Sequence, residues 1–288
     1  MTEPEDTTEA LIERLIHLLD VEELDTDLYR GARKQGGVGR VFGGQVIGQA
    51  LQSAQRSVEG GKIAHSLHAY FMRPGDEDHP IIYRVVRDYE GSSFATRRVI
   101  AMQKGRPILN MAASFQRPEE GFHHQDTMPV VPPPEDLPEK DFVPERLHIF
   151  LNRIRPIELR VLNPQTWSGT VTSEPAQHCW MRVGAKLPDD LGIHRAILGY
   201  LSDLMLLGTS MIPHGLGQMA ERMQTASLDH ALWLHEPFRV DEWLLYTTDS
   251  PWAGHARGFN RGQIYARDGR LVASVAQEGL IRLREPKT

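Results

Sequence analysis

The 288-residue sequence has very little cysteine and no excess of positive charge. Its single cysteine, Cys179, excludes an internal disulfide framework and any zinc site built only from cysteines. The 32 lysines and arginines are outnumbered by 38 acidic residues, and the formal net charge of −6 argues against a nucleic-acid partner. The longest run without a charged residue, Leu204 to Ala220, has 17 residues and contains a proline and three glycines. It is too short and too polar to cross a bilayer, so we expect no integral membrane segment.

Targeting and cofactor motifs are also missing. The acidic N-terminus differs from the basic and then apolar start of a secretory signal, and the last residues do not form a peroxisomal Ser-Lys-Leu address. The glycine-rich segment 36–44 fits neither a phosphate-binding loop nor a dinucleotide-binding motif. The segment 208–212 lacks the second glycine of a nucleophile elbow, and no metal-ligand motif occurs. We therefore predict a soluble, cytoplasmic protein that needs no metal ion and no redox cofactor.

A proline-rich segment from Arg117 to Pro144 separates two halves of similar size. It holds seven of the 19 prolines and seven acidic residues, a composition that favours an extended linker over a helix or a central strand. Apolar residues at helical spacing predict an amphipathic helix that begins after Thr7 or Thr8. The predicted organisation is a flexible N-terminus at 1–7, an N-terminal unit at 8–116, a linker at 117–150 and a C-terminal unit at 151–288.

The two halves read as a diverged repeat. Residues 65–74 and 228–237 share a pattern of apolar and polar residues at an offset of 163. At that offset residues 41–51 fall on residues 204–214, and both segments are apolar and contain glycine. Each half also carries a turn signal between strand-like runs, at Lys104-Gly105 and at Asp268-Gly269.

Each half is predicted to contain one core helix followed by four or five strands. Apolar residues at helical spacing favour a helix over 44–58, and the segment 196–207 is apolar nearly all round, as a buried helix is. A helix followed by an antiparallel meander is an α+β arrangement. The expected strands lie at 63–73, 80–89, 93–103 and 106–116 in the first half, and at 226–236, 242–248, 255–266 and 271–283 in the second.

Two polar residues stand in apolar surroundings. Asp203 lies in the predicted buried helix, where an ionised carboxylate costs several kcal/mol unless it is hydrogen-bonded and where its pKa is raised. Gln277 falls on the apolar face of the last strand, so its amide needs buried partners. Either residue could have a purely structural role, with Asp203 on a solvated stripe of the helix and Gln277 bonded to backbone groups. Ser227, near a predicted strand start, is weak evidence by itself.

Several blocks of sequence resemble the TesB-like type II acyl-CoA thioesterases. They run in order from residue 10 to residue 283 and lie at 41–50, 65–76, 199–204, 228–235, 256–265 and 275–279. The resemblance implies a double hotdog, in which two curved antiparallel sheets each wrap around a long helix. It also implies hydrolysis of fatty acyl-CoA to free fatty acid and CoA without a covalent acyl-enzyme.

The resemblance further implies a catalytic set and an assembly. The family uses an aspartate, a serine or threonine, and a glutamine, which fall here on Asp203, Ser227 and Gln277. The expected mechanism has Asp203 accept a proton from a water that is also held by the other two side chains. Relatives commonly assemble, so a homodimer or homotetramer is expected.

Two other functions on the same fold are considered. One is a non-catalytic acyl-CoA or lipid-binding protein, because fold does not determine function. The other is an enoyl-CoA hydratase, which needs an Asp/His pair, and His194 lies nine residues before Asp203. Candidates for contacts to the CoA phosphates, which are equally compatible with simple solvation, are Arg33, Lys34, Arg40, Arg97 and Arg98.

Overall fold

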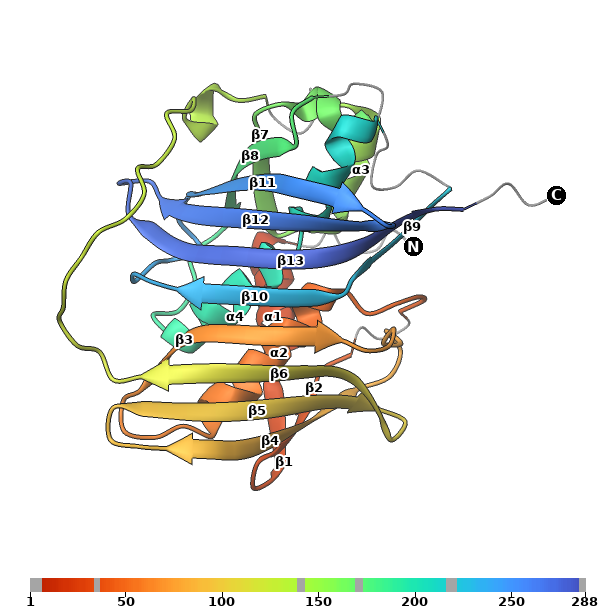
Figure 1. Ribbon diagram of the computed structural model, residues 1–288. Helices are drawn as coiled ribbons and strands as arrows, with labels where there is room; N and C mark the ends of the chain where they lie inside the picture. The colour runs from red at the N-terminus through yellow and green to blue at the C-terminus, as the bar shows by residue number, and fades with distance from the viewer. Residues whose placement is uncertain (1–6, 34–36, 139–142, 169–172, 216–221, 285–288) are drawn as a thin grey trace.

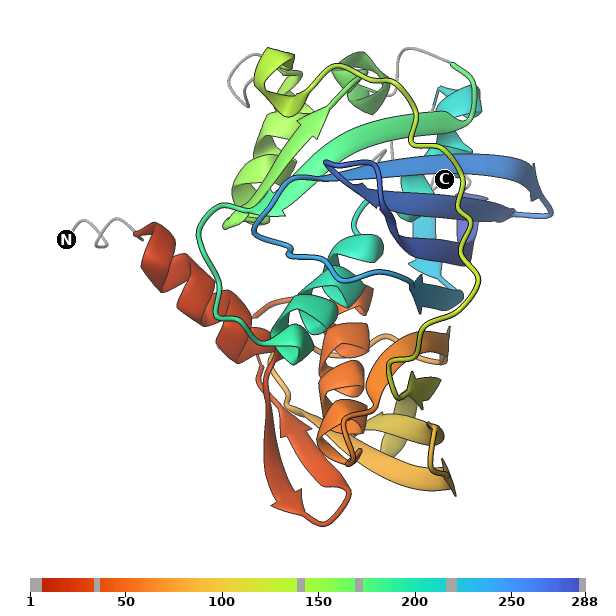
Figure 2. The same ribbon diagram turned by 90° about the vertical axis from the view of Figure 1, so that its left-hand side faces the viewer.

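The structure is a computed structural model that describes residues 7–33, 37–138, 143–168, 173–215 and 222–284. Its described part contains one antiparallel sheet of 13 strands that curves around the helices (Figures 1 and 2). The α-helices are α1 (Thr8–Leu19), α2 (Gly43–Arg56), α3 (Glu145–Arg153) and α4 (Leu191–Ser202). The strands of the first half are β1 (Val21–Asp25), β2 (Leu28–Gly31), β3 (Ile63–Phe71), β4 (Ile81–Glu90), β5 (Phe94–Gln103) and β6 (Arg106–Gln116). Those of the second half are β7 (Ile157–Val161), β8 (Ala176–Val183), β9 (Met223–Ser227), β10 (Asp229–Leu234), β11 (Leu244–Gly254), β12 (Arg257–Ala266) and β13 (Leu271–Leu283).

The strand order reveals a repeat about the centre of the sheet. The order is β1-β2-β4-β5-β6-β3-β10-β13-β12-β11-β8-β7, and β9 pairs with β13 outside this path. β3 and β10 therefore join the two halves, and each strand on one side has a counterpart at the same position on the other (Figure 1). The helices follow the same symmetry, since α1 and α2 correspond in chain order to α3 and α4. This is the helix-and-meander arrangement expected from the sequence.

The two central helices pack against each other in antiparallel fashion. A Cβ on Gly44 would lie 2.5 Å from the carbonyl oxygen of Tyr200, and one on Gly48 would lie 2.9 Å from that of Ala196. Because these two glycines are one turn apart on the same face, they let the backbones approach more closely than any side chain would allow. The N-terminus of α2 therefore meets the C-terminus of α4 in the interior of the molecule.

The first helix follows the prediction closely. α1 begins at Thr8, and the side chain of Thr7 accepts a hydrogen bond from the backbone N–H of Ala10 at 3.3 Å. Its buried positions, Ile12, Leu15 and Leu19, recur at helical spacing and face the core. Figure 2 shows α1 on the side of the helix pair that faces away from the sheet.

The repeat offset of 163 is right for strands and wrong for the central helices. β12 begins 163 residues after β5, at 257 against 94, whereas α4 begins 148 residues after α2, at 191 against 43. The predicted helix over 196–207 is instead α4, which ends at Ser202 and is followed by a 3-10 helix, η4 (Leu206–His214). The second half thus carries extra chain, including η4 and β9, between its central helix and the strand equivalent to β3. Ser227 lies in this addition.

Other differences concern elements with a weaker pattern. The single strand expected over 226–236 is two strands, β9 and β10, and β1, β2, α3, β7 and β8 were not predicted. The proline-rich segment contains a 3-10 turn, η1 (Pro134–Asp136), and α3 begins at Glu145. The segment also contacts the second half, because the Trp180 indole N–H donates to the Pro132 carbonyl at 2.9 Å.

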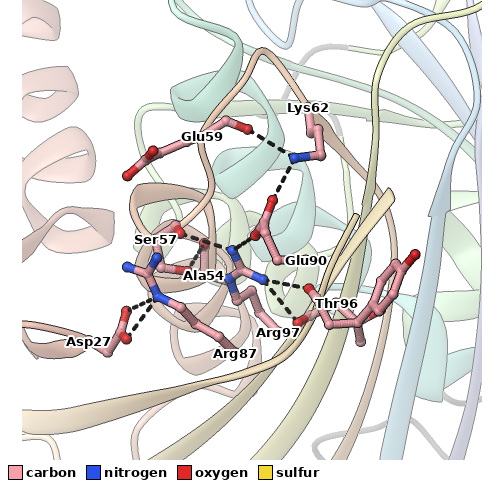
Figure 3. Close-up of polar contacts among 10 residues, drawn as sticks. Asp27, Ala54, Ser57, Glu59, Lys62, Arg87, Glu90, Thr96 and Arg97 are labelled. Carbon is pink, nitrogen blue, oxygen red and sulfur yellow. Dashed lines mark hydrogen bonds and ion pairs between the residues drawn. The ribbon is translucent and has the colours of Figure 1, made fainter. Parts of the chain in front are cut away.

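A buried arginine anchors the end of α2 to the sheet (Figure 3). The guanidinium of Arg97, on β5, has no exposed surface and donates to the hydroxyl and carbonyl oxygens of Ser57, at 2.9 and 3.1 Å. It also donates to the Tyr89 carbonyl at 2.9 Å and pairs with the Glu90 carboxylate. With these donors occupied inside the fold, Arg97 cannot bind a substrate phosphate.

One segment, Leu191–His214, is long and apolar enough to cross a membrane by length and composition alone. It comprises α4 and η4, and 83% of an 18-residue window within it is buried in the fold. These are core helices of the kind found in soluble proteins.

Candidate active site

Asp203 occupies the point where the two central helices meet. It is the C-cap residue of α4, directly after Ser202, and its backbone angles are still those of a right-handed helix. Its carboxylate accepts a hydrogen bond from the backbone N–H of Gly44, in the first turn of α2. A Cβ on Gly43 would come within 2.6 Å of Asp203 Oδ2, so the absence of a side chain there gives the carboxylate room. An acidic group at a helix N-terminus is favourably placed with respect to the helix dipole.

The structure brings Ser227 and Gln277 to the same carboxylate. Gln277 Nε2 donates to Asp203 Oδ1 at 2.6 Å, and Ser227 Oγ donates to the same oxygen at 3.2 Å. Both residues come from the paired strands β9 and β13, whose register places Ser227 opposite Gly279. The three residues singled out in the sequence thus form one cluster, contributed by α4, β9 and β13.

Burial controls the ionisation of Asp203. Desolvation raises its pKa from the usual range to about 6, against the opposing effect of the hydrogen bonds from Gln277, Ser227 and Gly44, which stabilise the carboxylate. The group is therefore mostly ionised at neutral pH, yet more basic than an exposed aspartate. A carboxylate with these properties can accept a proton from a bound water molecule.

A buried histidine, which the sequence did not single out, completes the cluster. His230, on β10, is 1% exposed, and burial lowers its pKa to about 3, so the ring is neutral. Its Nε2 lies 2.9 Å from Ser202 Oγ, and its Nδ1 lies 3.2 Å from Gln277 Nε2. Because Ser202 Oγ donates to the Gly199 carbonyl at 3.0 Å, His230 donates from Nε2 and accepts at Nδ1.

This network fixes the orientation of the Gln277 amide. Both N–H groups of Gln277 point to acceptors, namely the Asp203 carboxylate and His230 Nδ1. The amide oxygen, Oε1, is buried and has no hydrogen-bond partner among the residues that the structure describes. A buried acceptor without a partner is costly, so this atom marks a place for a hydrogen-bond donor beside Asp203.

Other reactive side chains are far less suited to catalysis. Cys179 is buried, and desolvation raises the pKa of its thiol to about 12, which leaves it un-ionised. His194, the candidate partner in a hydratase, lies at the start of α4 and has both ring nitrogens engaged, with the Pro188 carbonyl at 3.1 Å and the Val240 N–H at 3.2 Å. Arg98 is paired with Asp88, and Lys34 lies outside the described residues.

Comparison with known proteins identifies the family of this sequence. Residues 151–280 match the family model described as acyl-CoA thioesterase, and residues 32–116 match the model described as acyl-CoA thioesterase N-terminal domain. The chain is 41% identical to human acyl-coenzyme A thioesterase 8, over 93% of this chain and 88% of that protein. It is 39% identical to acyl-CoA thioesterase 2 of Haemophilus influenzae, over 96% of this chain and 99% of that protein.

Solved structures agree with this result. The crystal structure of an acyl-CoA thioesterase II from Mycobacterium marinum is 41% identical, with a TM-score of 0.80 over 94% of this chain and 99% of that one. A hot dog fold protein from Alicyclobacillus acidocaldarius, 19% identical, has a TM-score of 0.77 over 95% of this chain and 99% of that one, which supports the fold. The architecture is therefore the double hotdog expected from the sequence, except that the two expected sheets are joined into one through the pairing of β3 with β10.

Proposed function

This chain belongs to the acyl-CoA thioesterase family and hydrolyses acyl-CoA thioesters to a carboxylic acid and CoA, and we propose that Asp203, Ser227 and Gln277 carry out this reaction through a bound water molecule. The observation that carries the proposal is the convergence of two donors on one buried carboxylate, with Gln277 Nε2 at 2.6 Å and Ser227 Oγ at 3.2 Å.

In the proposed reaction, the water donates one hydrogen bond to Asp203 and the other to Gln277 Oε1. Asp203 removes a proton as the water oxygen attacks the thioester carbonyl carbon, which produces a tetrahedral intermediate. The intermediate collapses with cleavage of the C–S bond, and the proton held by Asp203 passes to the departing CoA sulfur. A thiolate is a good leaving group, so the reaction does not require a strong acid.

Positioning accounts for much of the rate in this scheme. The water is held in contact with both Asp203, which accepts its proton, and the thioester carbonyl carbon, which it attacks. The reaction therefore does not require a separate bimolecular encounter. His230 supports this geometry indirectly, because it holds the Gln277 amide with Oε1 free to accept from the water. Ser227 and Gly44 keep the Asp203 carboxylate in one orientation.

The substitution Asp203→Asn tests the proposal. We expect turnover of acyl-CoA, followed by release of free thiol, to fall by roughly 10²-fold to 10⁴-fold, because Asn cannot accept the proton. The folded-state pKa of Asp203 is raised, so its ionisation costs stability as pH rises through about 6. Asn carries no charge, so the substitution removes the cost of a buried ionised carboxylate, which is about 3 kcal/mol. This gain offsets the poorer hydrogen bonding of Asn, and the melting temperature at pH 8 should not fall. Near-normal turnover in this variant would overturn the assignment, and binding of acyl-CoA without hydrolysis by the wild type would favour a non-catalytic role.

We also propose a cytoplasmic homo-oligomer, a dimer or tetramer. The apolar segment Leu191–His214, which is long enough to span a membrane, is mostly buried, and this supports a soluble protein. The strands β1 and β7 lie at the two ends of the sheet path and leave edges available for assembly. Light scattering on the purified protein measures the number of subunits.

A further inference from the structure

A large cleft lies between the two halves, on the side of the central helices that α1 covers. Its volume is about 1050 Å³, and its lining comes from α1, β2, the N-terminus of α2, and the residues that connect α3 to β7. A cavity of this size is at the upper end of the range for small-molecule sites. The cleft is distinct from the Asp203 cluster, none of whose four side chains lines it.

The inner end of the cleft is aromatic and adjoins the catalytic cluster. Phe42 and Tyr200 line it, and their rings are in edge-to-face contact with centroids 5.0 Å apart. Phe42 caps α2 directly before Gly43, the residue against Asp203 Oδ2, and Tyr200 lies one turn before Asp203 in α4. Burial, together with the nearby charge of Asp203, raises the pKa of the Tyr200 hydroxyl to about 12, so that group is neutral.

The outer part of the cleft is rich in arginine, in a protein with a net charge of −6. The lining holds five arginines and three carboxylates, which are Arg14, Arg30, Arg33, Arg153, Arg155, Asp20, Glu22 and Glu77. Such a local excess of positive charge attracts an anionic ligand.

Some of these charges are already compensated within the fold. Glu22 is paired with Arg30, and Asp20 is paired with Arg56, which does not line the cleft. Arg33 bonds to Asp78 at 3.0 Å, which holds its side chain in place.

Two arginines remain uncompensated. The side chains of Arg153 and Arg155 are exposed and have no ion pair or hydrogen bond to any residue within the described ranges. They come from the second half of the chain, whereas Arg30, on β2, and Arg33, two residues after it, line the same cleft from the first half. Planar guanidinium groups with free N–H donors are suited to bind phosphate oxygens in a bidentate manner.

From this arrangement we infer that the cleft binds the phosphorylated nucleotide end of the acyl-CoA substrate, with Arg153 and Arg155 contacting phosphate oxygens. The inference rests on the proposed function, since the pantetheine arm must then reach from the arginines past Phe42 and Tyr200 to Asp203. The polarity of the cleft matches that of the ligand, because the charged end meets arginines and the neutral arm meets aromatic rings. Arg30 and Arg33 also line the cleft, but their charges are paired with Glu22 and Asp78, so the uncompensated positive charge comes from Arg153 and Arg155.

The test compares two substrates that differ only in the nucleotide, octanoyl-CoA and octanoyl-pantetheine. In the double variant Arg153→Ala/Arg155→Ala we expect KM for octanoyl-CoA to rise at least tenfold, with kcat and the KM for octanoyl-pantetheine within twofold of wild type. The matched control is Arg84→Ala, because Arg84 is also exposed and without an ion pair among the described residues, but lies on β4 and outside the cleft. An unchanged KM for octanoyl-CoA, or an equal rise for both substrates, would overturn the inference.

A binding measurement separates this inference from the catalytic proposal. Calorimetric titration with free CoA requires no turnover, and we expect a Kd at least tenfold weaker for the double variant than for wild type. In the wild type, the Kd should weaken between 50 and 500 mM NaCl more steeply than in the double variant, because phosphate contacts are screened by salt. The salt dependence can overturn the inference even if the alanine variant does not fold. A Kd for CoA that does not change with salt in the wild type contradicts a phosphate-binding site. If the wild type binds CoA tightly and in a salt-sensitive way but releases no thiol from acyl-CoA, the catalytic proposal is rejected and the CoA-binding inference is still supported.

Discussion

At the scale of single residues, the Asp203 carboxyl group has to be ionised to act as a base. Its pKa of about 6 predicts that kcat/KM declines as pH falls below that value and reaches a plateau above it. The donor Ser227 stabilises the ionised form, so Ser227→Ala should move this acid limb upward by about half a pH unit and lower kcat about tenfold. The pH dependence of thiol release measures both effects.

The variant Ser227→Thr provides the control for this prediction. It keeps the hydroxyl group, so the acid limb should stay near that of wild type. An acid limb at the same pH in Ser227→Ala and wild type would show that the serine does not influence the carboxylate in the active form.

In the proposed mechanism His230 acts as a positioning residue, since it touches Gln277 and Ser202 and its Nδ1 lies 4.0 Å from Asp203 Oδ1. His230→Ala frees the Gln277 amide to turn, so we expect kcat to fall at least tenfold while KM stays within twofold. His230→Asn places an acceptor near the position of Nδ1 and should recover part of kcat, which a merely structural role would not produce. Initial-rate kinetics measure the two constants separately.

A second histidine offers a matched control for His230. His235 Nε2 lies 2.9 Å from Ser274 Oγ, a pair with the same chemistry, but it is more exposed and does not contact the cluster. His235→Ala should leave kcat unchanged. Equal losses in the two alanine variants would argue against a specific role for His230.

The sequence revealed some of these residues and concealed others, for physical reasons. Asp203 and Gln277 stood out because a charge or an amide was predicted among apolar neighbours, and both are buried as expected. Ser227 was found only through the family resemblance, because a serine near a strand start is ordinary. His230 gave no signal, since a single histidine in an alternating strand is common, and its role depends on contacts with two other elements.

At the scale of secondary structure, the contact between α2 and α4 depends on glycine. Gly48→Ala places a methyl group 2.9 Å from the Ala196 carbonyl, which must force the two backbones apart. We expect a loss of about 1–3 kcal/mol in the free energy of unfolding, measured by chemical denaturation. Gly44→Ala moves the first turn of α2 away from Asp203 as well, so it should lower kcat of the folded protein in addition.

Gly199→Ala separates the cost of close packing between the two backbones from the cost of replacing any glycine in these helices. A Cβ on Gly199 would meet only the Ile47 side chain, at 3.3 Å, and a side chain can adjust where a backbone cannot. Gly199→Ala should therefore be nearly neutral in stability. A loss as large as that of Gly48→Ala would contradict the interpretation.

The strands that follow each central helix could be predicted from the sequence more accurately than the helix α4. Alternation of apolar and polar residues, together with turns such as Lys104-Gly105, where both residues have positive φ, fixed the meanders of both halves. The end of α4 could not be predicted, because the apolar pattern continues through η4, which is just as buried. Periodicity alone does not separate a buried α-helix from a buried 3-10 segment.

At the scale of the whole molecule, the proposed catalytic site is built by both halves. Asp203, Ser227 and Gln277 come from the second half, whereas Gly43 and Gly44, which shape the carboxylate site, come from the first. The inferred CoA cleft is likewise lined from both halves. The proposed site therefore lies at the junction of two similar units, and we expect its activity to depend on the packing at that junction rather than on the covalent linker.

A chain cleaved in the linker should for this reason remain active. Residues 117–124 are exposed, and the contacts of the linker with the second half begin at His123, whose Nε2 lies 3.7 Å from Glu236 Oε1. They continue at Gln125, which bonds to Gly269 and Leu271. A specific protease site inserted between Glu120 and Gly121 and then cut leaves the β3–β10 pairing and the α2–α4 packing in place. We expect the fragments to elute together in gel filtration, with kcat within twofold of the uncut insertion variant.

Stability after cleavage should change in a specific way. Since the cut removes only the covalent link, unfolding becomes a dissociation, and the denaturation midpoint should increase with protein concentration, whereas that of the uncut protein should not. Separation of the fragments without denaturant, or loss of activity while they remain together, would show that the linker itself holds the site. Retained activity would show that pairing of β3 with β10 and packing of α2 on α4 are sufficient to form it.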